Sequence, residues 1–226
     1  MPTPRRKLSD RCVGYLGVKV TEDHGFYLGL PSCIGRHKVA VFRYIRDKVW
    51  KRLQWWNQKL LSRAGKEILL KTLAQLMPNF AMNVYLLALE LCRDLEKMMN
   101  SFWWDNRGNG SGGINWMKWD RLCRPKTYGG LGFKQLHNFN IAMLGKQGWQ
   151  LLSNSHTLVS KIFKARYYPK SSFIEASLDS NPSYAWRSIM ATQKVIIQGS
   201  CIRLGGGGDI TLLLAMLLGS LIRRMD

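Results

Sequence analysis

The fold is decided by the stretch HKVAVFRYIRDKVWKRLQWWNQKLL at residues 37–61, where apolar residues return every three or four positions. A helix over this stretch gathers on one side the apolar residues Phe42, Ile45, Val49, Leu53, Trp56 and Leu60. The basic residues fall largely off that stripe, at Arg43, Arg46, Lys48, Lys51, Arg52 and Lys59. The spacing therefore predicts an amphipathic helix over His37–Leu61 with a cationic outer side.

Two more helices are predicted directly after this one. Ser62 is a suitable N-cap for a helix over Arg63–Met77, and Pro78 follows its end. The residues expected to face inward on that helix are Ala64, Ile68, Leu69, Thr72, Leu73 and Leu76. A third helix is expected over Leu89–Trp103. The connections are short, which favours an antiparallel helical bundle.

The segment before the bundle has the pattern of a β-hairpin over residues 13–30. Tyr15–Val20 and Phe26–Leu30 are rich in aromatic and branched residues, and turn-forming residues separate them. Pro31 is expected to stop the second strand.

The second half of the chain is also predicted to be helical. RGNGSGG at residues 107–113 is the best internal boundary, and Gly129–Gly132 is expected to form a tight turn. Helices are expected over Asn138–Leu152, Leu158–Tyr167 and Pro182–Ile197. The fold class is therefore mainly α with a small β-hairpin. The regions are 1–35, a helical domain at 36–106, a linker at 107–113, a second helical region at 114–204, and a disordered or loosely packed apolar tail at 205–226.

Charge is the most unusual property of the chain. Its 226 residues carry a net charge of +20, and the basic stretches 1–71 and 121–226 flank a neutral middle. Such a surplus implies a polyanionic partner, either nucleic acid or an acidic membrane surface; a generic basic protein is the alternative. Ile210–Ile222 is apolar but too short to span a bilayer, so no membrane span is expected.

Cysteine spacing and the N-terminus bear on the compartment. Five cysteines and four histidines form no disulfide or zinc pattern, which favours buried thiols in a reducing compartment. No apolar segment follows the basic N-terminus, so secretion is not expected. The sequence leaves the compartment unknown, with the nucleus and the mitochondrion as the intracellular alternatives.

The sequence contains no recognisable catalytic motif. No phosphate-binding loop, nucleophile elbow or zinc-protease motif occurs, and the few acids are too dispersed to hold a pair of cations. We therefore expect no enzyme activity, no cofactor, no metal and no small-molecule substrate. The oligomeric state stays open.

Binding chemistry is concentrated in residues 43–63, where Trp50, Trp55 and Trp56 lie among cations. Cations neutralise phosphates without sequence preference, and aromatic rings among them can stack on bases. Trp56 fits a core position better than a stacking one, and a solvated cationic surface is the alternative for the cations. The tryptophans expected to be packing residues are Trp103, Trp104, Trp116 and Trp119.

Several short sequence motifs in the chain resemble those of plant LINE-type (non-LTR) retrotransposon reverse transcriptases. In chain order, the motifs that carry the resemblance are YLGLPS at 27–32, IGR at 34–36, WWNQKLLSRAGKE at 55–67, MMNSFWW at 98–104, INWMKW at 114–119, GGLGF at 129–133, AMLGKQGW at 142–149, ARYYP at 165–169 and PSYAWRSI at 182–189. Similar segments occur as uncharacterised plant mitochondrial open reading frames.

The resemblance implies a place within the parent polymerase. Tyr27–Leu30 matches the hairpin that ends the palm, residues 36–104 match the helical thumb that holds the template–primer duplex, and residues 114–204 match the connection. The family's aspartate motif, fingers, endonuclease, Cys/His segment and RNase H acids are absent from this sequence. From residue 211 the chain departs from the family pattern, which a frameshift near residue 209 would explain.

The sequence thus predicts a catalytically incomplete reverse-transcriptase fragment that binds RNA–DNA or other nucleic-acid duplex non-specifically. The candidate phosphate contacts are Arg36, Lys38, Arg43, Arg46, Lys51, Arg52, Arg63 and Lys66. Two alternatives stay open: a retrotransposon relic without a selected role, and a helical protein-interaction module.

Overall fold

The computed structural model describes residues 25–31, 34–35, 37–59, 61–105, 114–178, 181–204 and 210–214, with the backbone alone for 201–204 and 210–214. The chain divides into a unit of Met1–Arg36 and a unit of His37–Asp226. The described residues are mainly helical, as the sequence predicts.

In the first unit, a two-residue turn joins strands β1 (Phe26–Tyr27) and β2 (Leu30–Pro31). The strands are antiparallel, and Phe26 pairs with Pro31. Leu28 and Gly29 both have positive φ, at 50° and 78°, as a two-residue hairpin turn requires. The prediction of one strand over Phe26–Leu30 is therefore wrong, because the chain reverses within it. The expected partner strand, Tyr15–Val20, lies outside the described residues.

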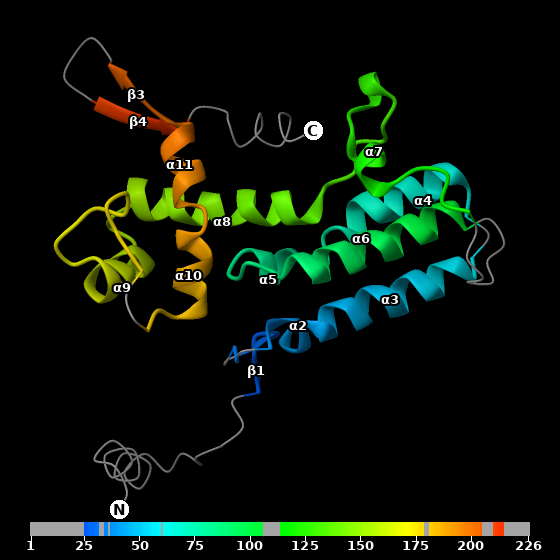
Figure 1. Ribbon diagram of the computed structural model, residues 1–226, viewed down its shortest axis with the longest axis horizontal. Helices are drawn as coiled ribbons and strands as arrows, with labels where there is room; N and C mark the ends of the chain where they lie inside the picture. Colours follow the sequence, from blue (N-terminus) through cyan, green and yellow to red (C-terminus); the bar gives the residue numbers. More distant parts are fainter. Residues whose placement is uncertain are drawn as a thin grey trace, which may run out of the picture. The chain divides into compact units, whose positions relative to one another are not determined.

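The first half of the second unit is built on a long helix that packs against another. Its elements, shown in Figure 1, are α2 (Lys38–Val41), α3 (Arg43–Asn57), α4 (Arg63–Leu69), the π-helix η1 (Leu70–Ala74), α5 (Asn79–Met82) and α6 (Leu89–Trp104). Helices α3 and α6 contact each other along their buried faces. Five residues of the predicted apolar stripe, Phe42, Ile45, Val49, Leu53 and Trp56, are confirmed as core, and Leu60 lies outside the described residues. The helix breaks at Phe42, whose buried ring lies 5.6 Å from that of Tyr85.

The helix predicted over Arg63–Met77 begins as expected and then departs from the prediction. Ser62 caps it by accepting a hydrogen bond from the backbone N–H of Gly65. At η1 the N–H of Gln75 donates to the carbonyl of Leu70, five residues back. This wider turn adds a residue and rotates the stripe by about 100°. Of the predicted inward residues, Ile68, Leu73 and Leu76 are exposed, and Leu70 and Ala74 are buried instead. Ile68 precedes the wider turn, so its exposure does not follow from that turn.

The second half surrounds an 18-residue helix, α8. The elements are α7 (Trp119–Cys123), the 3₁₀-helix η2 (Lys126–Tyr128), α8 (Leu136–Ser153), α9 (Leu158–Tyr167), α10 (Tyr184–Met190), α11 (Gln193–Gly199), β3 (Ser200–Leu204) and β4 (Ile210–Leu214). The bounds of α9 match the prediction, whereas the helix expected over Pro182–Ile197 is divided at Ala191 and Thr192. Strands β3 and β4 pair antiparallel; β3 directly precedes the predicted tail at 205–226, and β4 lies within it. Residues 205–209 and 215–226 lie outside the described residues.

The tight turn predicted at Gly129–Gly132 is confirmed. Gly129 and Gly132 have positive φ, and a Cβ on Gly130 would lie 2.0 Å from the carbonyl oxygen of Arg124. Only glycine fits so close an approach of two backbones.

The segments on either side of residues 107–113 pack together, although that linker itself lies outside the described residues. Asn140 of α8 accepts a hydrogen bond from the N–H of Leu87 and donates to the carbonyls of Met82 and Tyr85. Buried apolar residues also pack together around α8, among them Leu144, Leu151, Tyr168, Phe173 and Trp186. The linker therefore does not separate two independently packed cores in the described residues.

Two cysteines fall in the described core, Cys92 and Cys123, and both are buried. Burial raises the pKa of the Cys92 thiol to about 12, so the thiol stays protonated at neutral pH. This confirms the predicted buried thiols for these two residues; the side chains of the other three cysteines lie outside the described residues.

Candidate nucleic-acid interface

Helix α3 positions a row of cations on the side opposite its core contacts. Its buried residues pack against α6, so the remaining arc of the helix faces solvent. We define the α3 basic face as Arg43, Arg46, Lys48, Lys51 and Arg52. All of these are exposed except Arg46, which is partly buried. At 100° per residue they spread across the outer arc as one broad surface.

Four of the eight predicted phosphate contacts belong to this face: Arg43, Arg46, Lys51 and Arg52. The guanidinium of Arg46 lies 3.4 Å from the carboxylate of Asp47, and the two side chains are 40% and 52% exposed. An exposed pair of this kind is weak, so Arg46 stays available for a stronger anion. The sequence reasoning placed Lys48 among the cations of this helix without selecting it as a contact.

Two tryptophans flank the α3 basic face. Trp50 is 49% exposed and Trp55 is 52% exposed, whereas Trp56 is buried against Phe102 of α6. The core assignment of Trp56 is thus confirmed. The ammonium of Lys59 lies 5.1 Å from the centre of the Trp55 ring, so that ring already carries a cation on one face.

Lys38 lies apart from this face. It belongs to the short helix α2, is half-buried, and places its ammonium 4.8 Å from the ring centre of Tyr184. Arg36 lies outside the described residues. Lys38 is therefore not counted in the α3 basic face.

The structure gives Arg63 and Lys66 a different role from the predicted phosphate contact. Arg63 donates to the carbonyl of Trp103 at 2.7 Å, and the buried ammonium of Lys66 donates to the carbonyls of Phe102 and Asp105. These carbonyls form the end of α6, where the helix carries partial negative charge. Burial lowers the pKa of Lys66, against an opposing effect from Asp105. Both cations therefore cap a helix.

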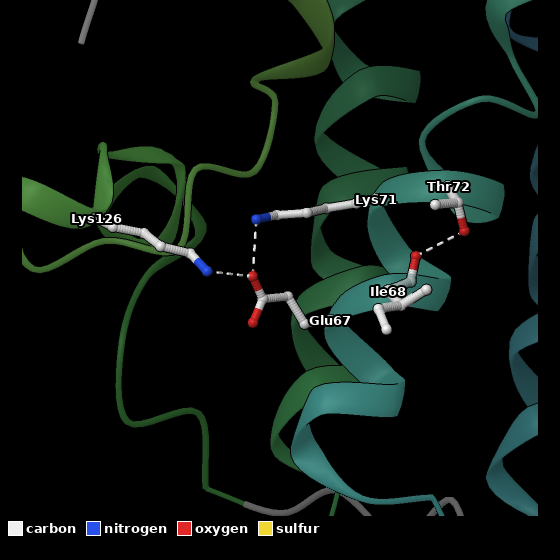
Figure 2. Close-up of polar contacts among 5 residues, drawn as sticks. All are labelled: Glu67, Ile68, Lys71, Thr72 and Lys126. Carbon is white, nitrogen blue, oxygen red and sulfur yellow. Dashed lines mark hydrogen bonds and ion pairs between the residues drawn. The ribbon is translucent and has the colours of Figure 1, made fainter.

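A neighbouring carboxylate, Glu67, forms ion pairs with two further cations. Figure 2 shows Glu67 between Lys71 and Lys126, with its Oε1 2.8 Å and 3.0 Å from the two ammonium nitrogens. Hydrogen bonds from both lysines hold the pKa of Glu67 below its usual value. The contact also ties α4 to the turn at η2, so these lysines serve packing between the two halves of the chain.

Sequence reasoning about tryptophans was only partly right. Trp103 and Trp119 are buried, and Trp119 stacks on Phe133 with ring centres 4.9 Å apart. Trp116 was expected to pack, but it is 72% exposed. Its position directly after the Gly-rich stretch gave no periodicity from which its exposure was predictable.

A buried carboxyl on α6, Glu96, was missed altogether. Its Oε1 accepts a hydrogen bond of 2.7 Å from the N–H of Leu136, at the start of α8. Burial raises the pKa of Glu96 to about 7, although the bond from Leu136 and the charge of Arg93 oppose the shift. In the described residues, no three His, Cys, Asp or Glu side chains are grouped closely enough to hold a metal ion.

We predict that Glu96 makes folding stability pH-dependent. Its pKa is higher in the folded chain than the ordinary 4.5, so the folded state binds more protons between roughly pH 4.5 and 7. Stability should therefore fall as pH rises through that window. Glu96→Gln keeps an acceptor for Leu136 and removes the charge, so urea unfolding at pH 8 should show it about 2 kcal/mol more stable than the parent.

The matched control for Glu96 is Glu90→Gln, an exposed carboxyl on the same helix. This change should alter the free energy of unfolding at pH 8 by less than about 0.5 kcal/mol. Parallel pH profiles for Glu96→Gln and the parent chain would contradict the role given to Glu96.

The comparisons with known proteins fit this basic helical chain. It is 39% identical, over 132 residues, to the Uncharacterized mitochondrial protein AtMg00310 of Arabidopsis thaliana, which covers 58% of this chain and 85% of that protein. The chain belongs to the family of that protein. A second match is 29% identical over 139 residues to the Putative ribonuclease H protein At1g65750 of Arabidopsis thaliana.

That second match covers 62% of this chain, and the chain spans only 22% of the length of the ribonuclease H relative. Together the two relatives are consistent with a retrotransposon-related origin. No protein-family model matches the chain, and no solved structure matches it. In the part of the chain that the structure describes, no helix combines the length and the apolar character needed to cross a membrane.

Proposed function

We propose that this chain is the thumb and connection part of a LINE-type reverse transcriptase and that it binds nucleic-acid duplex without sequence preference. The observation that carries the proposal is the α3 basic face, which collects four of the predicted contacts on the outer arc of one helix. The net charge of +20 and a relative named as a ribonuclease, an enzyme that acts on nucleic acid, support the same class of partner.

The binding mode follows from the kinds of side chain on the surface. Lys and Arg neutralise phosphates and release counterions, which gives affinity that falls steeply with salt. The long, exposed side chains of α3 carry charge but form no rigid hydrogen-bonding pattern for base edges, so backbone shape and charge are the expected signals. The exposed rings of Trp50 and Trp55 would add stacking where a strand is unpaired.

We further propose that the chain holds no polymerase centre of its own. The aspartates on which nucleotide addition depends are part of the palm in the family that it resembles, and the matching motif does not occur in this sequence. On this proposal any activity in DNA synthesis belongs to a separate or longer polypeptide, and this chain contributes the grip on the duplex.

We predict that neutralising the α3 basic face removes most duplex binding. The variant changes Arg43, Lys51 and Arg52 to Gln, three exposed cations whose loss leaves the buried face of α3 intact. Filter-binding titrations of an RNA–DNA duplex at several salt concentrations should show affinity roughly 50-fold lower at low salt. The slope of log K against log salt should become shallower by about 2 to 3.

A charge-matched control comes from α9, where Lys161, Lys164 and Arg166 are also exposed. Changing these three to Gln removes the same net charge and should reduce affinity less than about three-fold through the long-range field alone. Equal losses in the two variants would show that binding follows total charge and not the α3 surface. No binding by the parent chain at low salt would remove the proposal.

A further inference from the structure

A pocket of about 400 Å³ lies between α6 and the segment that runs from Lys118 to Asn138. Its wall on the α6 side includes Arg93, Glu96 and Asn100, and His137 at the start of α8 lies opposite. The volume is within the range of small-molecule sites. None of the α3 basic face contributes to it, so the pocket is a separate candidate site.

Two buried polar atoms belong to residues of this pocket and have no hydrogen-bond partner among the described residues. Asn100 is only 7% exposed; its Nδ2 donates to the carbonyl of Met117 at 3.2 Å, but its Oδ1 accepts nothing. His137 Nδ1 is likewise without a partner. Buried polar atoms are normally paired, and both of these atoms belong to side chains that line the pocket.

The charges around the pocket favour an anion. Arg93, Lys97 and Lys118 line it, against the two acids Glu96 and Asp120. Both acids have hydrogen-bond partners: Leu136 N–H donates to Glu96, and the side-chain amide of Gln135 donates to Asp120 at 3.4 Å. Lys97 is highly exposed and lies a full 4.0 Å from Asp94. With three cations against two acids, the lining carries a net positive charge.

We propose that this pocket binds a nucleotide, free or as the phosphorylated end of a strand. Arg93 and Lys118 hold the phosphate, and Asn100 Oδ1 accepts a hydrogen bond from a donor on the base or sugar. A bare anion would satisfy the cations and leave Asn100 unpaired, whereas a nucleotide carries both an anionic group and N–H or O–H donors. The inference does not depend on the proposed duplex binding by α3.

The test is equilibrium dialysis of labelled AMP against the full chain. We expect saturable binding, with inorganic phosphate competing more weakly than unlabelled AMP. Arg93→Ala combined with Lys118→Ala should weaken AMP binding at least about ten-fold, since both are charge-assisted contacts. The control pair, Arg121→Ala with Lys146→Ala, removes the same charge from exposed positions outside the pocket and should bind AMP as the parent does.

A second variant tests the part of the site that recognises more than phosphate. Asn100→Leu should lower the affinity for AMP toward that for inorganic phosphate, while leaving the affinity for inorganic phosphate itself unchanged. A circular dichroism spectrum equal to that of the parent confirms that this variant folds; if it does not fold, the Arg93 and Lys118 pair decides alone.

Oligonucleotides with and without a 5′-phosphate separate the two sources of the ligand. Stronger displacement of AMP by the phosphorylated strand identifies a strand end, and equal displacement identifies a free nucleotide. Absence of saturable AMP binding overturns the proposal, as does unchanged affinity in the Arg93 and Lys118 variant. The α3 variant should bind AMP normally, so failure of duplex binding and failure of this site are distinguishable.

Discussion

Trp186→Ala should lower the free energy of unfolding by about 3–5 kcal/mol, the range observed when a large buried aromatic ring is removed from a core. Trp186 is fully buried on α10 and lies within 6 Å of four other rings. Tyr167 and Tyr168 stack on it, with ring centres at 4.8 Å and 5.5 Å, and Phe163 and Phe173 meet it at steeper angles. Alanine would leave a cavity at the junction of three segments.

Urea unfolding followed by circular dichroism measures the loss of free energy. A thermal melt of the same variant should show a melting temperature lower by roughly 10 °C. Trp186→Phe is the informative companion, because Trp186 Nε1 is buried without a hydrogen-bond partner among the described residues. Phenylalanine keeps most of the ring contacts and removes that unpaired N–H, so it should cost less than about 2 kcal/mol.

Trp116→Ala is the matched control for the loss of an indole. Trp116 is exposed, and a substitution on an exposed surface should alter stability by no more than about 0.5 kcal/mol. If Trp186→Ala and Trp116→Ala had similar small effects, the ring cluster around α10 would not be the core that the structure describes.

The sequence predicted helices well where an apolar stripe keeps one period. Helices α3, α6 and α8 lie close to their expected positions, because their buried residues recur at three and four along the whole element. Helix α9 matches its expected bounds although Ser160 is its one buried residue. The prediction failed over α4 and η1: Ile68 is already exposed before the turn widens, and within η1 a stripe read with an α-helical period loses its phase. The exposed Leu73 and Leu76 follow directly from that change of phase.

The candidate site shows a similar division. The outward placement of Arg43, Lys51 and Arg52 was predictable, because it depends only on where the apolar stripe of the same helix lies. The hydrogen-bond partners of Lys66 were not predictable, because the packing of α4 on α6 decides whether its ammonium contacts solvent or the end of another helix. Glu96 was missed for the same reason, since its partner is a backbone N–H forty residues away.

Asn140→Leu should lower the free energy of unfolding by about 3 kcal/mol, although leucine has the same branching and the same number of side-chain heavy atoms as asparagine. Asn140 is fully buried, and its side chain satisfies the N–H of Leu87 and the carbonyls of Met82 and Tyr85, at 2.8, 2.9 and 3.1 Å. Leucine would leave these backbone groups without their partner, and each buried unpaired group costs about 1–3 kcal/mol. Denaturant unfolding measures the loss, and Gln150→Leu, an exposed amide on the same helix, should be nearly neutral. Since Asn140 joins α8 to the segment between α5 and α6, its loss should also weaken the coupling between the two halves of the chain. A loss below about 0.5 kcal/mol would mean that other contacts hold the halves together and that this amide is dispensable.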